Sequence, residues 1–467
     1  SAVYLDKSDA GIVLLDISTG EFIGTEGTFE QVGKLLQSFD PTEILFNKAQ
    51  KESFHRFIGK DPRQDRHLFP LEDWAFGWDY SYEKLTEQLA CTNLKGFGFQ
   101  DMPLAIRAAG AILHYLEITE HKDLQHINAI KRIANDQHVW LDKFTVRNLE
   151  LVQAQQEGGI PLIKVLDQTA TAMGSRMLKR WLLLPLKDPK AINDRLAKVE
   201  ALIKDPELLE TVQKQLTLIA DLERLISKVA VRRVNPRELV SIKRSLLQVE
   251  PLIELLSKSK NTHLNTWAKD YADCDGLIQK IEKVLKEDAP LLINQGKMIN
   301  DGVDENLDRL RAIAYSGKDY LLQMQKQETE RTGISSLKIG FNKVFGYYLE
   351  VTHAHKDKVP AEWIRKQTLV NAERYITPEL KTYEEKILNA EDQLVEIEQR
   401  IFLDLVEFAS DYVEMVQRNC RIVGALDLLS SFASTAIKNR YCKPEITDGT
   451  TLDIKQGRHP VIEKELA

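Results

Sequence analysis

This sequence of 467 residues lacks the features that would place it in a membrane or around a nucleotide. Its longest apolar runs are short, as in residues 181–184, whereas a membrane-spanning helix needs about 20 apolar residues. No charged-then-apolar leader opens the chain. The phosphate-binding pattern G-x-x-x-x-G-K-S/T is missing, because the Gly-Lys pairs at 59–60, 296–297 and 317–318 lack the earlier Gly and the following hydroxyl. We therefore expect no membrane contact, no cofactor and no catalysis by this chain.

Cysteines and histidines at metal-ligand spacing are also few. The four cysteines do not stand at metal-ligand spacing: Cys91, Cys274, Cys420 and Cys442. We interpret them as the reduced thiols of a cytosolic protein. His353 and His355 would share one face of an extended segment and could chelate a metal, but no further ligand stands near them. We expect them to be surface residues and expect no metal site.

Glycine and proline are scarce as well, with 23 Gly and 15 Pro, which argues against long disordered linkers. The length predicts two to four domains. The net charge is -7, whereas a protein whose whole surface wraps nucleic acid is usually basic. Any contact with DNA must therefore be local, and most of the chain must be scaffold.

The first 120 residues read as a layered α/β domain. An apolar run at 11–17, a turn at 18–20 and a second run at 21–25 predict paired strands. A helix over 28–38, a strand over 43–46 and a helix over 102–119 follow. Asp16 ends the first strand, so a metal-dependent nuclease with Asp16 as a ligand is one hypothesis. No other acid is placed convincingly, and the alternative is that Asp16 starts the turn.

From about residue 140 helical patterns dominate and predict a helical bundle. Amphipathic stretches such as 208–231 lie between predicted helix stops at prolines 161, 185, 189, 206, 236, 251 and 290. Near the end, 441–445 and 452–454 predict the start of a new strand-containing unit, followed by 457–463.

Two apolar seams over 304–418 have the steps of three and four residues that are typical of a coiled coil. The seam positions are Leu307, Leu310, Ala314, Gly317, Leu321 and Met324, then Leu380, Tyr383, Ile387, Ala390, Leu394, Ile397, Ile401 and Leu405. Each helix would reach roughly 40 Å or more at about 1.5 Å per residue. We predict two antiparallel helices that carry a small module, about 332–376, at their far end.

The module has its own boundaries and a strand pattern. Gly333 is a helix stop, and Thr377-Pro378-Glu379 supplies a cap and a first turn for the next helix. Alternating residues over 337–342 and 347–352 predict a hairpin, and 365–370 predicts a further strand.

The module is locally basic. Residues 330–375 hold eight basic and five acidic side chains, a net +3 in a chain of -7. Donors suited to phosphate oxygens gather there, and they are our candidate DNA-contacting residues: Asn342, Lys343, Arg365, Lys366, Thr368, Asn371 and Arg374. By charge alone a solvated basic surface explains the patch better, because a +3 patch is common.

Ordered motifs resemble signatures of the MutS family of DNA mismatch-repair proteins. Residues 171–182 (TAMGSRMLKRWL) resemble its core signature, 339–351 (IGFNKVFGYYLEV) its clamp signature, and 371–380 (NAERYITPEL) the segment that re-enters its lever. Residues 457–461 (GRHPV) look like the start of its ATPase domain, and 96–98 with the following helix look like its connector. The clamp match argues against the family branch that lacks a clamp. The core and clamp sequences are similar to those of bacterial members.

The resemblance implies a domain order and a mainly α fold. It implies a connector at 1–120 (RNase H-like, without nuclease activity), a helical core with the first lever arm at 121–325, a β-rich clamp at 326–380, a returning lever helix with core at 381–440, and the start of a truncated ATPase domain at 441–467. The family's mismatch-reading domain with its Phe-x-Glu motif, and nearly all of its ATPase domain, would be missing.

The resemblance also implies function and partners. The clamp would hold mismatched double-stranded DNA by its backbone, without sequence preference. The levers would couple the clamp to the ATPase domain, and the connector would contact a MutL-type partner. The resemblance implies that the full-length protein binds ATP and Mg²⁺, forms a homodimer and lies in the bacterial cytoplasm, at the nucleoid. This stretch alone is expected to be a monomer.

One departure from the family concerns Val370, where the family often has Lys. The difference weakens the transfer of a DNA contact to that position. A helical protein-interaction scaffold without DNA binding is the alternative.

Overall fold

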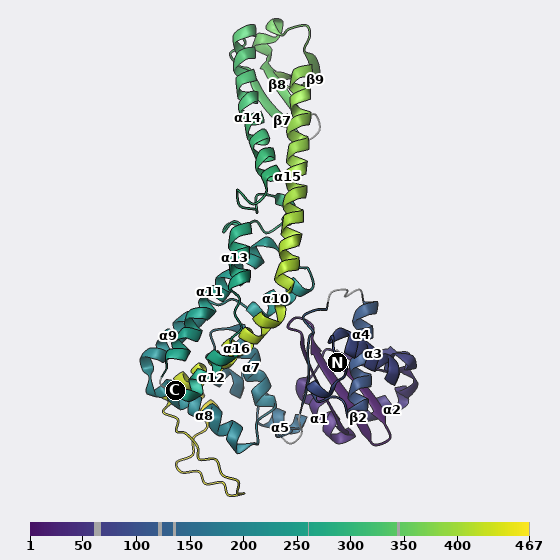
Figure 1. The fold of residues 1–467 in the computed structure, drawn as a ribbon, viewed down its shortest axis with the longest axis vertical. Coiled ribbons are helices and arrows are strands. Elements are labelled where there is room, and N and C mark those ends of the chain that lie inside the picture. Colours follow the sequence, from purple (N-terminus) through teal and green to yellow (C-terminus); the bar gives the residue numbers. More distant parts are fainter. Residues whose placement is uncertain (60–66, 120–123, 134–136, 260, 343–345, 467) are drawn as a thin grey trace. The chain divides into compact units, whose positions relative to one another are not determined.

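The computed structural model describes residues 1–59, 67–119, 124–133, 137–259, 261–342 and 346–466, apart from the side chains of residues 143, 313–319 and 386–388. It divides into two compact units. Unit 1 comprises Ser1–Val234, Ser241–Ile278 and Phe408–Ala467, and unit 2 comprises Asn235–Val240 and Gln279–Glu407. Figure 1 shows both units as ribbons.

Unit 1 begins with a six-stranded sheet in the order β5-β4-β1-β2-β3-β6. Strands β1, β2 and β3 pair antiparallel, whereas β4, β5 and β6 join in parallel. The strands are β1 (Ala2–Asp6), β2 (Asp9–Asp16), β3 (Glu21–Thr28), β4 (Glu43–Asn47), β5 (His67–Leu71) and β6 (Ile130–Arg132). The three strands expected over 11–17, 21–25 and 43–46 are thereby confirmed.

Both faces of this sheet are covered, because successive strand residues enter different cores. In β2, Ile12 and Leu14 pack in one core and Val13 in the other. Residues of α1 and α2 complete the first core, and residues of α3 and α4 complete the second. These helices are α1 (Phe29–Phe39), α2 (Lys51–Ile58), α3 (Trp78–Gln88) and α4 (Pro103–Ile118). The helices expected over 28–38 and 102–119 are therefore present, and Thr28 caps α1 in a capping box with Gln31.

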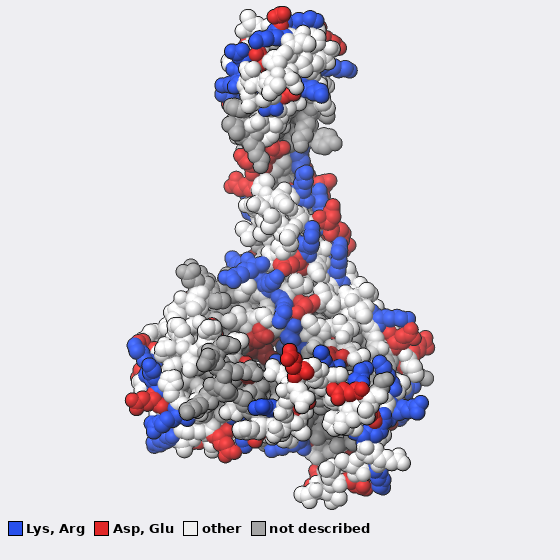
Figure 2. Space-filling model, turned by 180° about the vertical axis from the view of Figure 1, so that it is seen from behind, with Lys and Arg blue, Asp and Glu red and all other residues white. Residues whose placement is uncertain are grey.

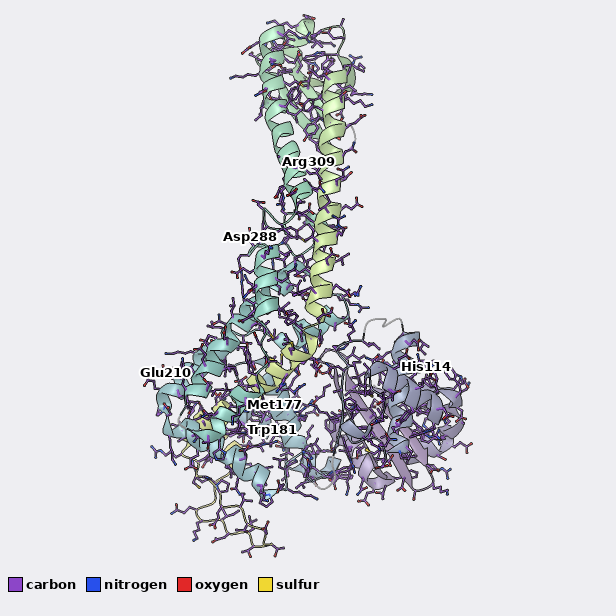
Figure 3. The ribbon with its side chains drawn as sticks, viewed as in Figure 1. His114, Met177, Trp181, Glu210, Asp288 and Arg309 are labelled. Atoms are coloured by element: carbon purple, nitrogen blue, oxygen red, sulfur yellow. The ribbon has the colours of Figure 1, made fainter. Side chains whose placement is uncertain are left out.

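The rest of unit 1 is helical and packs around α16 (Val413–Asn439), which contacts α7, α8, α9 and α10. The other helices are α5 (Lys143–Asn148), α6 (Leu162–Leu166), α7 (Ala172–Leu183), α8 (Pro189–Lys204), α9 (Pro206–Leu216), α10 (Leu222–Ala230), α11 (Pro236–Lys258, of which 241–258 belong to unit 1), α12 (Thr262–Asp270), α13 (Asp275–Val284, of which 275–278 belong to unit 1) and α17 (Pro460–Leu466). Figure 3 marks Met177 and Trp181 on α7. The Trp181 ring lies 3.3 Å from the guanidinium carbon of Arg195, which joins α7 to α8.

Helix α16 is long and apolar enough to cross a bilayer by composition, although no such segment was expected. Its apolar window is 67% buried inside the protein. A helix buried at the centre of a helical bundle is apolar on most of its sides, and this burial explains the composition of α16.

One predicted helix stop in the helical region was wrong. Pro251 lies inside α11 rather than ending a helix. The buried Val249, Leu252 and Leu256 around it supply packing that offsets the lost backbone hydrogen bond. The amphipathic stretch 208–231 forms most of α9 and all of α10, and Asp221 between these helices pairs with Arg176 of α7.

The strands expected at 441–445 and 452–454 are likewise not formed, although the structure describes all of 441–459. Most of these residues are exposed, and a strand needs a neighbour to satisfy its backbone groups.

Unit 2 contains two long helices and a four-stranded sheet, besides the start of α11 and the end of α13. The helices are α14 (Glu305–Thr332) and α15 (Pro378–Ser410, of which 378–407 belong to unit 2). The strands, in the order β7-β8-β10-β9, are β7 (Lys338–Asn342), β8 (Gly346–Thr352), β9 (Ile364–Thr368) and β10 (Ala372–Ile376), with the 3₁₀ helix η5 (His353–Lys358) after β8. The expected hairpin and further strand are therefore present.

The two long helices run antiparallel along the stretches that contact each other. The ring of Tyr320 stacks on that of Tyr383 at 3.7 Å, and Arg311 pairs with Glu398 at 2.8 Å, so later residues of α14 meet earlier residues of α15. Six of the described seam positions are buried, namely Leu307, Leu321, Met324, Leu380, Ala390 and Leu405, and the other five are half-buried, namely Leu310, Tyr383, Leu394, Ile397 and Ile401. The seam side chains of Ala314, Gly317 and Ile387 lie outside the described residues.

The ends of the helices follow the sequence signals. Gly333 ends α14 with a φ of 63°, a conformation that glycine adopts without strain. Thr377 accepts a hydrogen bond from the Leu380 N–H at 3.1 Å, and Pro378 begins α15. Glu384 of α15 then accepts the N–H of Tyr347, which fastens the helix to the sheet.

Candidate nucleic-acid interface

The four-stranded sheet of unit 2 places one face against the two long helices. Leu349, Val351 and Tyr375 on this inner face pack with Trp363 and with helix residues of α14 and α15, namely Leu321, Met324 and Leu380. Because side chains alternate along a strand, Glu350 and Arg374 lie on the opposite, outer face. The predicted DNA-contacting residues of β9 and β10 are therefore divided between two faces and one turn.

Glu373 is a carboxylate buried on the inner face, with 3% of its side chain exposed. It accepts a hydrogen bond from the Tyr375 hydroxyl, and its Oε1 lies 3.0 Å from Lys356 and 3.4 Å from Arg365. The bond from Tyr375, followed by that from Lys356, lowers the pKa of Glu373 to about 2. Arg365 is 57% exposed, so it shares its charge with Glu373 and still reaches solvent.

Arg374 is held on the outer face by three neighbours. Its Nε donates to Glu350 at 3.0 Å and its Nη1 donates to Gln367 at 2.9 Å. Its guanidinium carbon lies 4.2 Å from the ring centre of Tyr348. Only 19% of the Arg374 side chain is exposed, so this cation is already paired inside the sheet.

The β9–β10 turn presents the most exposed part of the candidate interface. The Leu369 N–H donates to the Ala372 carbonyl at 2.8 Å, which leaves Val370 and Asn371 at the tip. His353 secures the turn, because its N–H donates to the Asn371 carbonyl at 3.3 Å and its Nε2 lies 3.1 Å from the Leu369 carbonyl. Val370 is 93% exposed.

Lys366 lies at an irregularity in the pairing beside this turn. Gln367 pairs with Arg374 but Arg365 pairs with Tyr375, so Lys366 is the extra residue of a β-bulge. Its side chain is exposed, as are those of Thr368 and Asn371. A bulge turns a side chain away from regular alternation, and sequence alternation alone therefore could not place Lys366.

The structure thus brings part of the predicted set together. Arg365, Lys366, Thr368 and Asn371 lie along β9 and its turn, with exposed side chains. Asn342, at the end of β7, is half-buried and has polar contacts of its own. Lys343 lies outside the described residues.

Figure 2 shows Lys and Arg spread over the end of unit 2 that carries the sheet, with acidic residues interleaved. The buried position of Glu373 was not predicted from the sequence. Its signal was the two-residue spacing from Tyr375, which places both side chains on the same face of β10.

The two hypotheses of a metal site, one at Asp16 and one at His353 and His355, have simpler structural explanations. Asp16 accepts hydrogen bonds from the Ser18 N–H at 2.8 Å and the Ser18 hydroxyl at 2.7 Å, as the turn interpretation predicts. His353 and His355 lie on the 3₁₀ helix η5, so the extended geometry considered for chelation is wrong. Among the described residues no group of three His, Cys, Asp or Glu side chains could hold a metal ion.

Comparison with known proteins defines the class of the chain. The family model described as MutS domain III matches residues 144–433, and that of MutS domain II matches residues 1–128. The DNA mismatch repair protein MutS of Cytophaga hutchinsonii is 55% identical over 467 residues, which are 100% of this chain and 54% of that relative. The proteins of the same name from Bacteroides fragilis and Christiangramia forsetii are 51% and 50% identical over 100% of this chain and 54% and 53% of their own lengths.

The chain therefore belongs to the MutS family. It spans about half the length of the curated relatives it matches.

Proposed function

We propose that this chain acts in DNA mismatch repair and that the sheet of unit 2 is a clamp for the backbone of double-stranded DNA. The observation that carries the proposal is the cluster of exposed donors on β9 and its turn, in a chain of the MutS family. Lys, Arg and amide donors bind phosphate oxygens whatever the base sequence. A clamp of this kind would suit a repair protein, because mismatches vary in sequence.

The two long helices are the proposed levers. Helices α14 and α15 contact each other through stacked tyrosines and the Arg311–Glu398 pair, so a displacement of one is transmitted to the other. In the full-length protein they would couple the clamp to an ATPase domain that uses ATP and Mg²⁺ and forms a homodimer. No residue of this chain is assigned to ATP, since the chain has no P-loop pattern.

The six-stranded domain of unit 1 is the proposed connector, which would contact a MutL-type partner. The proposed location is the cytoplasm, at the nucleoid. For this chain alone we propose a monomer.

The DNA contact is tested by a salt series with labelled duplexes in a gel-shift assay. We expect weak binding, equal for unrelated sequences, whose log K falls linearly with log salt as counterions are released. The triple variant Lys343→Ala, Arg365→Ala, Lys366→Ala should bind more weakly. The slope should fall in magnitude by up to about 2.7, or about 0.9 for each lost phosphate contact.

The matched control removes three lysines from unit 1: Lys190→Ala, Lys214→Ala and Lys258→Ala. It changes the net charge equally and should leave both affinity and slope near those of the parent chain. If the clamp triple behaves like this control, the clamp assignment is wrong. A chain that binds no duplex even at low salt would instead favour a helical protein-interaction scaffold.

A further inference from the structure

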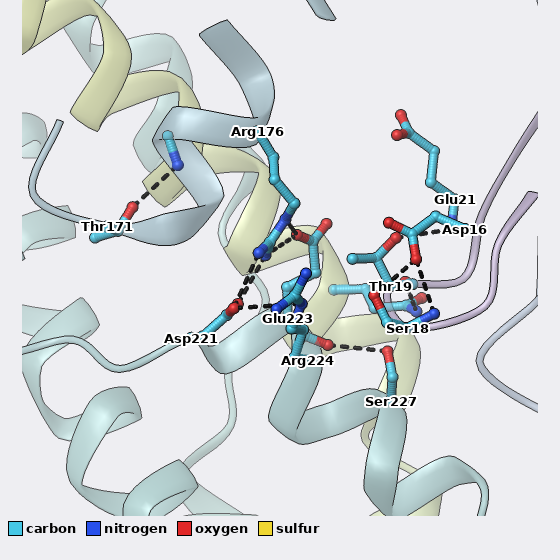
Figure 4. Close-up of polar contacts among 12 residues, drawn as sticks. Asp16, Ser18, Thr19, Glu21, Thr171, Arg176, Asp221, Glu223, Arg224 and Ser227 are labelled. Carbon is cyan, nitrogen blue, oxygen red and sulfur yellow. Dashed lines mark hydrogen bonds and ion pairs between the residues drawn. The ribbon is translucent and has the colours of Figure 1, made fainter. Parts of the chain in front are cut away.

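Unit 1 contains a polar cavity between the turn after β2 and helices α7, α10 and α16. Its volume is about 90 Å³, and its walls carry four cations and three acids: Lys131, Arg176, Arg180 and Arg421, with Asp16, Glu21 and Glu223. Figure 4 shows the part of this wall in which Arg176 faces Asp221 and Glu223, with Asp16 and Glu21 nearby. A single water needs about 10–15 Å³ of such volume, so the cavity has room for an ion of several atoms.

The acids of the wall are largely engaged. Arg176 pairs with Asp221 at 2.7 Å and with Glu223 at 2.6 Å. Glu21 pairs with Arg180. Asp16 accepts two hydrogen bonds from Ser18 within its own turn. The carboxylates of the wall are therefore already paired with Arg176 and Arg180 or hydrogen-bonded within the turn.

Lys131, Arg180 and Arg421 come from three different elements, and of these three residues Arg180 alone has a carboxylate partner, Glu21, in the part of the chain that the structure describes. Burial, followed by the charge of Arg421, lowers the pKa of Lys131 on β6. Burial lowers the pKa of Arg180 on α7 as well, and Arg421 on α16 again opposes its charge. Glu223 favours the charged forms of both groups, but it is shared with Arg176.

Among the described residues, Lys131 and Arg421 have no carboxylate within ion-pair distance. Like charges that converge on a cavity without enough acids are stabilised by an anion that neutralises them.

We propose that this cavity binds a small tetrahedral oxyanion of the phosphate class, held by Lys131, Arg180 and Arg421. A guanidinium donates two parallel hydrogen bonds to such an anion, and the lysine ammonium adds a point charge. The Asn128 and Gln417 side chains also line the cavity. The Asn128 amide donates to Gln417 Oε1 at 3.0 Å, and the Gln417 amide donates to the His126 carbonyl at 2.9 Å. A bound anion would therefore stabilise the packing of the sheet region on the helical region within unit 1.

The test measures thermal unfolding of the whole chain in potassium phosphate and in potassium chloride at equal ionic strength. Anion binding to the folded state raises Tm by mass action, and we expect a gain of about 2–4 °C in phosphate. Arg421→Gln should lose most of this gain. In chloride the same variant should be at least as stable as the parent, because one repelling charge is gone. Lys131→Gln is the second cavity variant, with the same expected loss.

Arg56→Gln on the exposed surface of α2 is the matched control, and it should retain the full gain. Phosphate also stabilises proteins generally by exclusion from their surfaces, which affects all variants alike. Equal gains in the parent, Arg421→Gln, Lys131→Gln and Arg56→Gln would therefore overturn the proposal. Phosphorus NMR gives a direct readout, since a bound phosphate line should broaden with the parent chain and not with Arg421→Gln.

Adenosine monophosphate distinguishes the source of the phosphate group. A larger Tm gain than with inorganic phosphate at equal concentration would assign the cavity to nucleotide phosphates. An equal or smaller gain would assign it to the free anion. Either result supports phosphate recognition if the Tm gain is lost in Arg421→Gln. If neither ligand raises Tm, the proposal is overturned.

Discussion

Asp427 determines how helix α7 begins. This aspartate of α16 is 1% exposed, and it accepts hydrogen bonds from the Ala170 N–H, the Thr171 N–H and the Thr171 hydroxyl at 2.9, 2.7 and 2.6 Å. Thr171 in turn accepts the Gly174 N–H and caps the helix. A buried carboxylate with three donors satisfies helix-end groups that would otherwise be unpaired.

Gly174→Ala should destabilise unit 1 by about 1–3 kcal/mol, because overpacking strains a close contact. A Cβ at this position would lie 2.4 Å from Oδ2 of Asp427, on a side chain that three hydrogen bonds hold in place. Urea unfolding measures the change. Gly96→Ala is the control, since a Cβ there meets nothing within 4 Å. Equal stabilities of the two variants would contradict this account of Gly174.

Glu373 should make the stability of unit 2 depend on pH. Its pKa is lowered from 4.5 to about 2 in the folded protein, so its contribution is complete above about pH 4.5 and is lost as the pH falls toward 2. Glu373→Gln should therefore be less stable than the parent at neutral pH, and the difference should shrink as the pH falls below 4.5. Unfolding of both chains by urea over this range measures it. A difference that stays constant with pH would rule out the carboxylate as its cause.

At the scale of elements, the β9–β10 hairpin combines rigidity with exposure. His353 secures two carbonyls of the turn, while Val370 at the tip is 93% exposed. An isolated exposed apolar residue needs no special explanation. Its place beside Lys366, Thr368 and Asn371 makes it a useful reporter of whether this turn meets DNA.

Val370→Lys should strengthen duplex binding and increase the salt slope by about 0.9, as one added phosphate contact would. Leu322→Lys is the matched control, because Leu322 is 65% exposed and belongs to α14, not to the hairpin. The gel-shift salt series measures both variants. If Val370→Lys and Leu322→Lys change the slope equally, the added charge acts at long range and the hairpin does not touch the DNA.

At the scale of the whole molecule, the two compact units should unfold as separable transitions. Glu398 offers a way to perturb one of them. Its side chain is 3% exposed, and it accepts the Met298 N–H at 2.9 Å and pairs with Arg311 at 2.8 Å. Removal of this carboxylate leaves the Met298 N–H without its acceptor, whereas Arg311 keeps Asp301 as a partner at 2.7 Å.

Glu398→Ala should destabilise unit 2 by about 1–3 kcal/mol, because the Met298 N–H loses its acceptor. Differential scanning calorimetry should then show one transition moved to lower temperature and the other unchanged. The double variant with Arg311→Ala should cost less than the sum of the two single variants, because the residues share one interaction. A uniform shift of all the heat absorption would mean that the chain unfolds as a single unit.

Much of the local structure was predictable from the sequence. The strands of residues 11–17 and 21–25, the helix after Thr28, and the limits of the sheet module at Gly333 and Pro378 depend on propensity, capping and alternation. These effects act over a few residues along the chain, so neighbours in the sequence determine them. The ordered motifs also indicated the MutS family, which the domain models and relatives show.

Tertiary structure decided the features that depend on distant partners. Pro251 stays within a helix because buried neighbours support it, and 441–459 forms no strand among its described residues because no edge pairs with it. Glu373 and Glu398 are buried acids whose partners are Lys356 and Arg311.

The cavity of unit 1 is the clearest case. Lys131, Arg180 and Arg421 are up to 290 residues apart in the sequence and meet only through packing. Composition and periodicity determine what each segment can form. Charge compensation and burial depend on which segments pack together, and only the folded chain decides that.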